Sequence, residues 1–170
     1  EPRDRGADDV LPQPVSGVHV LDNDAPGIVI QESNGGTLVL EGNATTGIAD
    51  NYTLRLAKMP TSDVTIDIAY DAGQLTLANA RLTFGATTAD GKAHAFITFT
   101  AANYNQAVTI AVSATDDSAL GIEQQREDPG ISSIRHSVVN ASSANEYDNL
   151  SELLGVEVHD DDTAGVLVRQ

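Results

Sequence analysis

Residues 64–70 read VTIDIAY, an alternation of large apolar residues with smaller or polar ones over seven positions. Successive side chains of an extended chain point to opposite faces. The apolar set from Val64 to Tyr70 therefore falls on one face, and the residues between them fall on the other. This pattern predicts a β-strand with one buried face.

The same period of two recurs on both sides of this stretch. Turn clusters such as Ser33–Gly36 and Asp90-Gly91 separate the runs, and no helical period lasts more than one turn. Seven or more short strands in a segment of this length predict an all-β fold, a Greek-key immunoglobulin-like β-sandwich. The other runs with this period are 52–56, 75–77, 82–84, 97–99, 108–112, 134–138 and 154–158.

The sequence also contains an internal repeat. Residues 17–30 read GVHVLDNDAPGIVI, and residues 155–168, which begin 138 positions later, read GVEVHDDDTAGVLV. A match of this length indicates a tandem array. The predicted division is a tail and linker of a preceding repeat (1–24), a complete repeat (25–162) and the start of a following one (163–170). The alternative is that two edge strands of one domain resemble each other.

Composition excludes several classes of function. The chain of 170 residues has a net charge of −16 and a pI near 4.2, which disfavours binding to nucleic acid or to an anionic membrane surface. The sequence contains no run of 18 apolar residues, so membrane insertion is not expected. Cysteine is absent, so a secreted domain of this kind would need another source of rigidity, such as a bound metal. The segment that begins at Glu1 is not a signal peptide, so we expect any export signal elsewhere in a longer precursor.

Acidic residues cluster where predicted strands end. The clusters are Asp160–Asp162, Asp116-Asp117 and the pair Asp22 and Asp24. Carboxylates a few ångströms apart repel each other by about 1 kcal/mol per pair even in water, and a hard divalent cation removes that cost. Calcium accepts six to eight oxygen ligands in irregular geometry, and it suits a loop-based cluster better than magnesium does. The alternative is that these acids are solvated linker residues.

The stretch from Pro26 to Asp162 resembles a Calx-beta-type repeat, a family found in large bacterial surface adhesins and in sodium–calcium exchangers. The resemblance covers about four-fifths of the chain. It implies a calcium-binding sandwich with neighbouring repeats of the same polypeptide as partners. The matching pieces are PTSDVTI (60–66), ITFTAANYNQ (97–106), DD (116–117), YDNL (147–150) and DDD (160–162).

The same resemblance implies a set of calcium ligands at one end of the sandwich. An acid from the following loop, Glu123 or Glu127, is expected to complete the set. By the repeat, Asp22 and Asp24 would serve the equivalent site of the preceding repeat. The ligands implied by position are Glu41, Asp116, Asp117, Asp160, Asp161 and Asp162.

Two segments depart from the family's pattern. The motif Leu82-Thr83-Phe84 is repeated as Ile97-Thr98-Phe99, with residues 85–95 inserted between the two copies. The loop 119–128 is longer and less regular than the family's spacing between the paired aspartates and the next acid. These loops are the non-generic parts of the repeat.

Other polar residues are predicted to be structural. Glu32, Asp50, Asp63 and Asp90 are expected to be surface or turn acids. His136 falls on the inward phase of its strand, so we expect a half-buried, hydrogen-bonded histidine rather than a metal ligand. Asn-x-Ser/Thr sequons begin at Asn43, Asn51, Asn140 and Asn149, which fits a surface-exposed secreted protein.

The sequence thus predicts a non-catalytic structural spacer of an adhesin-like, secreted cell-surface protein, made rigid by Ca²⁺ at the junctions between repeats. No nucleophile elbow, phosphate-binding loop or dinucleotide fingerprint is present, and the chain is not expected to be an enzyme. Self-association into a fibre or array is a further expectation. The alternatives are a recognition module that binds a protein or glycan through the loops 85–95 and 119–130, and an accessory domain of an enzyme.

Overall fold

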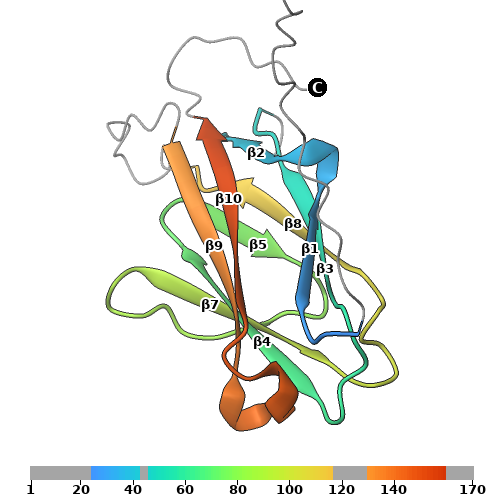
Figure 1. Ribbon diagram of the computed structural model, residues 1–170. Helices are drawn as coiled ribbons and strands as arrows, with labels where there is room; N and C mark the ends of the chain where they lie inside the picture. Colours follow the sequence, from blue (N-terminus) through green and yellow to red (C-terminus); the bar gives the residue numbers. More distant parts are fainter. Residues whose placement is uncertain (1–23, 43–45, 117–129, 160–170) are drawn as a thin grey trace, which may run out of the picture.

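The computed structural model describes residues 24–42, 46–116 and 130–159, which form two packed β-sheets (Figure 1). The smaller sheet has the strand order β1-β3-β8-β5, and the larger has the order β2-β10-β9-β4-β7-β6. The predicted all-β sandwich is therefore confirmed. The strands are β1 (Ile28–Glu32), β2 (Thr37–Leu40), β3 (Asp50–Leu56), β4 (Val64–Asp71), β5 (Leu75–Ala78), β6 (Thr83–Phe84), β7 (Lys92–Phe99), β8 (Val108–Ala114), β9 (Gly130–Val138) and β10 (Ser151–His159).

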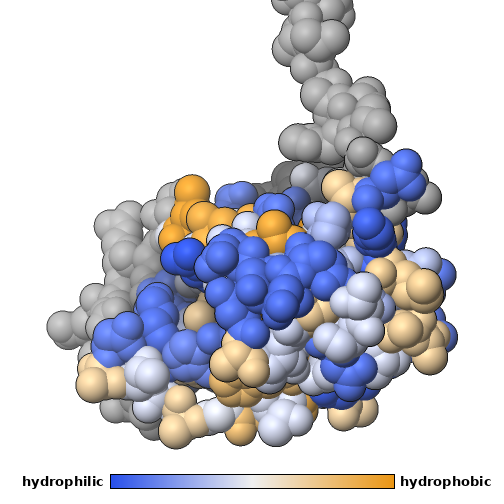
Figure 2. Space-filling view, turned by 60° about the horizontal axis from the view of Figure 1, so that its bottom comes forward, coloured by the Kyte–Doolittle hydropathy of each residue, from blue (hydrophilic) through white to orange (hydrophobic). Residues whose placement is uncertain are grey.

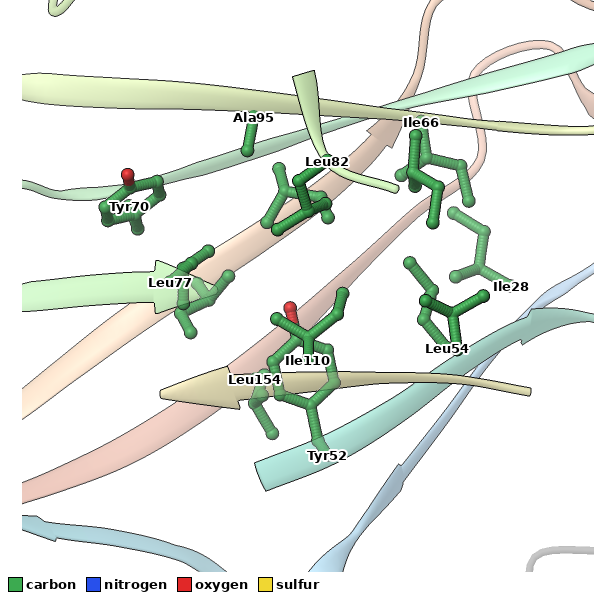
Figure 3. Packing of buried hydrophobic residues seen from close by; sticks show 14 of the residues in the cluster. Ile28, Tyr52, Leu54, Ile66, Tyr70, Leu77, Leu82, Ala95, Ile110 and Leu154 are labelled. Carbon is green, nitrogen blue, oxygen red and sulfur yellow. The ribbon is translucent and has the colours of Figure 1, made fainter. Parts of the chain in front are cut away.

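The core lies between the inner faces of the two sheets. Along β4, every residue of the predicted apolar set is buried and the intervening residues are only partly so. Side chains from both sheets meet in this layer, including Tyr52 and Ile110 from the smaller sheet and Ile66 and Leu154 from the larger (Figure 3). The period of two places these residues on one face, and burial of that face holds the sheets together.

The chain changes sheet between its first two strands, β1 and β2. β1 pairs with β3 in the smaller sheet, whereas β2 pairs in parallel with β10 in the larger one. The short 3₁₀ turn η1 (Ser33–Gly35) joins them, and its residues Asn34 and Gly35 have φ values of 54° and 82°. The predicted turn at Ser33–Gly36 is thus the point where the chain crosses between the sheets, and left-handed backbone at Asn34 and Gly35 permits that sharp change of direction.

Asp50, expected to be a surface or turn acid, is instead a buried residue of β3, with 6% of its surface exposed. Its carboxylate accepts hydrogen bonds from the Ser33 hydroxyl, from the backbone N–H of Leu38 at 3.1 Å and from that of Asn51 at 2.7 Å. The expectation is wrong because Asp50 lies in phase with the buried Tyr52. The carboxylate fixes η1 and β2 to β3 and so holds the crossing in place.

The insertion predicted at residues 85–95 is shorter in the structure. Lys92–Ala95 belong to β7, where Ala93 and Ala95 are buried opposite β4. The loop proper therefore runs only from Gly85 to Gly91. The aromatic residue before it, Phe84, is 51% exposed, so it does not belong to the core.

The described residues do not test the predicted repeat boundaries, which remain a prediction. The strands run from Ile28 to His159, within the expected repeat of 25–162, but residues 1–23 and 160–170 lie outside the described residues. Within the described ranges, the structure contains no helix with the length and apolar character needed to span a membrane.

Candidate calcium-binding end

Several strand ends lie at one end of the sandwich, the upper end in Figure 1, among them the last residues of β2, β8 and β10 and the first of β3, β5 and β9. Glu41 directly follows β2 and is buried, with 8% of its surface exposed. Its backbone N–H donates to the carbonyl oxygen of His159 at 2.8 Å. Glu41 is therefore fixed beside the residue after which the sequence continues into Asp160–Asp162.

Asp116 lies at the same end, two residues after the last residue of β8. A surface hollow of about 240 Å³ connects the end of β8 with the neighbourhood of Glu41. The residues that line it include Leu40 and Gly42, on either side of Glu41, and Ser113 and Ala114 at the end of β8. The fold thus brings two of the predicted ligands, more than 70 positions apart in the sequence, to one end of the molecule.

Of the remaining predicted ligands, the structure places Asp24 alone. Within residues 24–42, 46–116 and 130–159, no three histidine or acidic side chains come together as a potential metal site. Asp24 is described and exposed, and it precedes β1 at the opposite end of the sandwich (Figure 1). The predicted site acids that lie outside the described residues are Asp22, Asp117, Glu123, Glu127, Asp160, Asp161 and Asp162.

The opposite end of the sandwich, turned forward in Figure 2, carries a central hydrophilic patch bordered by more apolar residues. Its loops carry the short 3₁₀ turns η3 (Asn140–Ser142) and η4 (Asn145–Tyr147). The carboxylate of Glu146 accepts hydrogen bonds from the backbone N–H of Thr61 at 2.7 Å and from its hydroxyl at 2.8 Å. These bonds lower the pKa of Glu146, so this acid serves to join two loops.

Two acids that were expected to be structural are confirmed as such. Asp63 is exposed, and its backbone carbonyl accepts a hydrogen bond from Ala144 at 3.1 Å. Asp90 lies in the turn before β7, where it accepts hydrogen bonds from the Thr88 hydroxyl and from the backbone N–H of Lys92. The bond from Thr88 is the main cause that lowers the pKa of Asp90.

His136 is completely buried, rather than half-buried as expected. Its Nε2 lies 2.8 Å from the hydroxyl oxygen of Tyr52, so the pair forms a hydrogen bond between the two sheets. The two rings are perpendicular, with centroids 5.3 Å apart. Nδ1 has no hydrogen-bond partner in the described part of the chain. Burial lowers the pKa of His136 to about 4 and raises that of Tyr52, so both side chains are neutral at pH 7.

Nothing in the sequence predicts the polar cluster on the outer face of the larger sheet. Nδ1 of His94 lies 2.9 Å from a carboxylate oxygen of Asp67, and the His94 ring stacks on Phe96 with centroids 6.4 Å apart. His94 and Asp67 are diagonal neighbours, because the residue directly opposite His94 is Ala69. Only the strand register, which a single sequence does not reveal, brings such a pair together.

Two of the sequons face each other across the loop before β10. The Asn140 amide donates to the side-chain oxygen of Asn149 at 2.9 Å, and the Asn149 backbone N–H donates to the side-chain oxygen of Asn140 at 2.9 Å. Asn51 is exposed on β3, and Asn43 lies outside the described residues.

No family model matches the sequence, and no curated protein matches it either. Among solved structures, a chain in the crystal structure of the CaDoc0917–CaCohA2 complex is 15% identical, with 76% of this chain and 99% of that chain covered and a TM-score of 0.37. AggA, the major subunit of aggregative adherence fimbriae type I from Escherichia coli, is 11% identical, with coverages of 84% and 98% and a TM-score of 0.34. At these identities the likeness concerns the fold alone.

Proposed function

We propose that this chain is a non-catalytic structural module of a cell-surface protein, a Calx-beta-type spacer repeat that calcium makes rigid at its junction with the next repeat. The observation that carries the proposal is the position of Glu41 and Asp116. Both lie at the end of the sandwich where β10 finishes, immediately before Asp160–Asp162.

The chemistry of this donor set suits a hard divalent cation. Five of the six ligands implied by position are aspartates that follow β8 or β10 in the sequence, and calcium accepts carboxylate oxygens in irregular geometry. If Asp160–Asp162 continues the extended path of β10, its first and third side chains point to one face and its second to the other. Such a run could bind ions that belong to one repeat and to the base of the next.

The proposed mechanical role follows from this placement. In a tandem array each repeat contacts only its neighbours, so the junctions decide how stiff the array is. An ion held between the last strand of one sandwich and the base of the next would fix the angle between them. An array of such repeats would hold a distant binding domain away from the cell surface.

A recognition module is the second candidate function, and one observation favours it. Phe84 exposes half of its surface immediately before the loop 85–91, and exposed aromatic side chains are common anchors in protein interfaces. Binding of the chain to a panel of glycans and surface proteins would support this function, provided that Phe84→Ala abolishes the signal. The spacer function predicts no binding.

A series of single substitutions tests the proposed site. We expect Asp117→Ala and Asp161→Ala to weaken calcium binding about tenfold or more, because each removes a proposed ligand. Asp63→Ala is the matched control, since Asp63 is exposed and lies in a loop at the opposite end. Isothermal titration calorimetry measures all three. Equal affinities in all variants would mean that diffuse negative charge attracts the ion and that no coordination site exists.

A further inference from the structure

The larger sheet has one edge that is only half covered. β10 pairs with β9 over Ser151–Val158, but β2 pairs with β10 only over Val156–His159. On the side of β2, no strand of the described part of the chain accompanies residues 151–155. In an antiparallel pair, the backbone N–H and C=O groups of successive residues point alternately toward and away from the partner strand. Leu150 points toward β9, because its carbonyl accepts a hydrogen bond from the Val138 N–H. The backbone groups of Ser151 and Leu153 therefore point away from β9, toward the open side.

The opposite edge of the same sheet is closed. The outward-pointing backbone carbonyls of β7 accept hydrogen bonds from the segment that precedes β7. The short strand β6 pairs with the middle of β7. Capping of this kind prevents an edge from pairing with another chain. The capping bonds are Thr88 N–H to Lys92 at 2.7 Å, Gly85 N–H to His94 at 2.8 Å and the Arg81 guanidinium to Thr98 at 2.9 Å.

A groove runs along the open edge, between β10 and β1. It has a volume of about 350 Å³ and lies against apolar side chains of both sheets. Leu153 on its rim is 68% exposed. Two acids, Glu32 and Glu152, also line the groove. The residues that form its apolar part are Ile28, Val29, Ile30, Leu153 and Leu154.

Residues 165–169, which read GVLVR, match this edge in pattern, length and charge. Their apolar pattern repeats that of residues 27–31, GIVIQ, most of which form β1. Five residues equal the length of the open stretch 151–155. If this segment were extended, Leu167 and Arg169 would share one face, so that Leu167 could contact the apolar lining and Arg169 could pair with Glu32 or Glu152.

We propose that residues 165–169 of a second copy of this chain bind in the groove as a strand added to β10. Residues 165–169 of the same chain are poorly placed to bind in this groove. Residues 160–164, which join them to β10, span at most about 17 Å and would have to pass over β2 to reach Gly155. A second copy has no such constraint. Backbone hydrogen bonds would give the affinity, and the apolar and charged pockets would give the register. This association goes beyond the calcium-dependent role and does not rest on it.

The test is sedimentation velocity of the full chain in a calcium chelator, from micromolar to millimolar concentration. We expect concentration-dependent association that Arg169→Glu weakens about tenfold and that the charge-swapped pair Glu152→Lys with Arg169→Glu restores. Asp63→Lys is the control for Glu152→Lys, because it makes the same change of charge at an exposed site that does not line the groove. Combined with Arg169→Glu, it should not restore association.

Three results would overturn the proposal. The first is a monomer at every concentration. The second is association that neither Arg169→Glu nor the charge swap alters. The third is a monomer whose Ser151–Gly155 amides are protected from hydrogen exchange until Leu167→Asp is introduced, because the chain's own segment would then occupy the groove. Since the measurement is made without calcium, its failure would leave the proposed calcium site untouched.

Discussion

Replacing Asp50 with alanine is expected to lower the free energy of unfolding by about 3 kcal/mol. The substitution removes the acceptor for the Ser33 hydroxyl and for two backbone N–H groups, those of Leu38 and Asn51. Two of the donors, Ser33 and Leu38, lie on either side of the point where the chain crosses between the sheets, and the third, Asn51, lies on β3. Without the carboxylate they are left partly buried and unpaired, and the pairing of β2 with β10 weakens with them.

Denaturant unfolding measures this effect, with Asp63→Ala as the control. Asp63 is an exposed acid in a loop, so its replacement should change stability by no more than about 0.5 kcal/mol. Asp50→Asn should fall between the two, because the amide keeps one acceptor and loses the charge. If Asp50→Ala is as stable as Asp63→Ala, the carboxylate does not hold the crossing.

The second large effect concerns acid pH. The pKa of His136 falls from 6.5 in the unfolded chain to about 4 in the folded core, because burial disfavours the charged imidazolium. The unfolded chain therefore binds more protons between these values, and stability decreases as pH falls from 6.5 to 4. The loss from this one group amounts to about 3 kcal/mol. Stability from His136 is fully present above pH 6.5.

The test compares denaturant unfolding at pH 7 and pH 4 in the wild type and in a double variant, Tyr52→Phe with His136→Leu. Replacing both partners leaves no polar group unpaired in the core, so this variant should fold and should lose this part of the pH dependence. His94→Gln is the control, since His94 is only partly buried on the outer face, and it should keep the full dependence. An unchanged pH dependence in the double variant would show that carboxylates alone cause it.

The sequence predicted the sandwich because the period of two is strong in the central strands. Burial of one face explains both the alternation and the packing in β3, β4 and β8. The sequence did not reveal that β1 and β2 belong to different sheets. That division depends on the left-handed backbone at Asn34 and Gly35 and on the carboxylate of Asp50. The phase of Asp50 with Tyr52 was a usable signal, but a charged residue is rarely assigned to a core face.

The candidate site was predictable only in part. The clustering of aspartates at strand ends indicated the chemistry, and the fold then placed Glu41 and Asp116 at one end. The position of Glu41 beside His159 depends on the parallel pairing of β2 with β10, a long-range contact that no local pattern encodes. The roles of His136 and of the half-covered edge of β10 depend on register and on how far β2 extends, so they too required the three-dimensional arrangement.

Thermal unfolding of the wild-type chain in millimolar calcium and in chelator tests the central claim most directly. Extracellular calcium sites of this type bind at about 10⁻⁴–10⁻³ M, and at ten times the dissociation constant one site adds about 1.4 kcal/mol of stability. The account predicts a higher melting temperature in calcium, with no such gain in Asp117→Ala or Asp161→Ala. Superimposable curves in calcium and in chelator would contradict it and would leave the acids as solubilising charge.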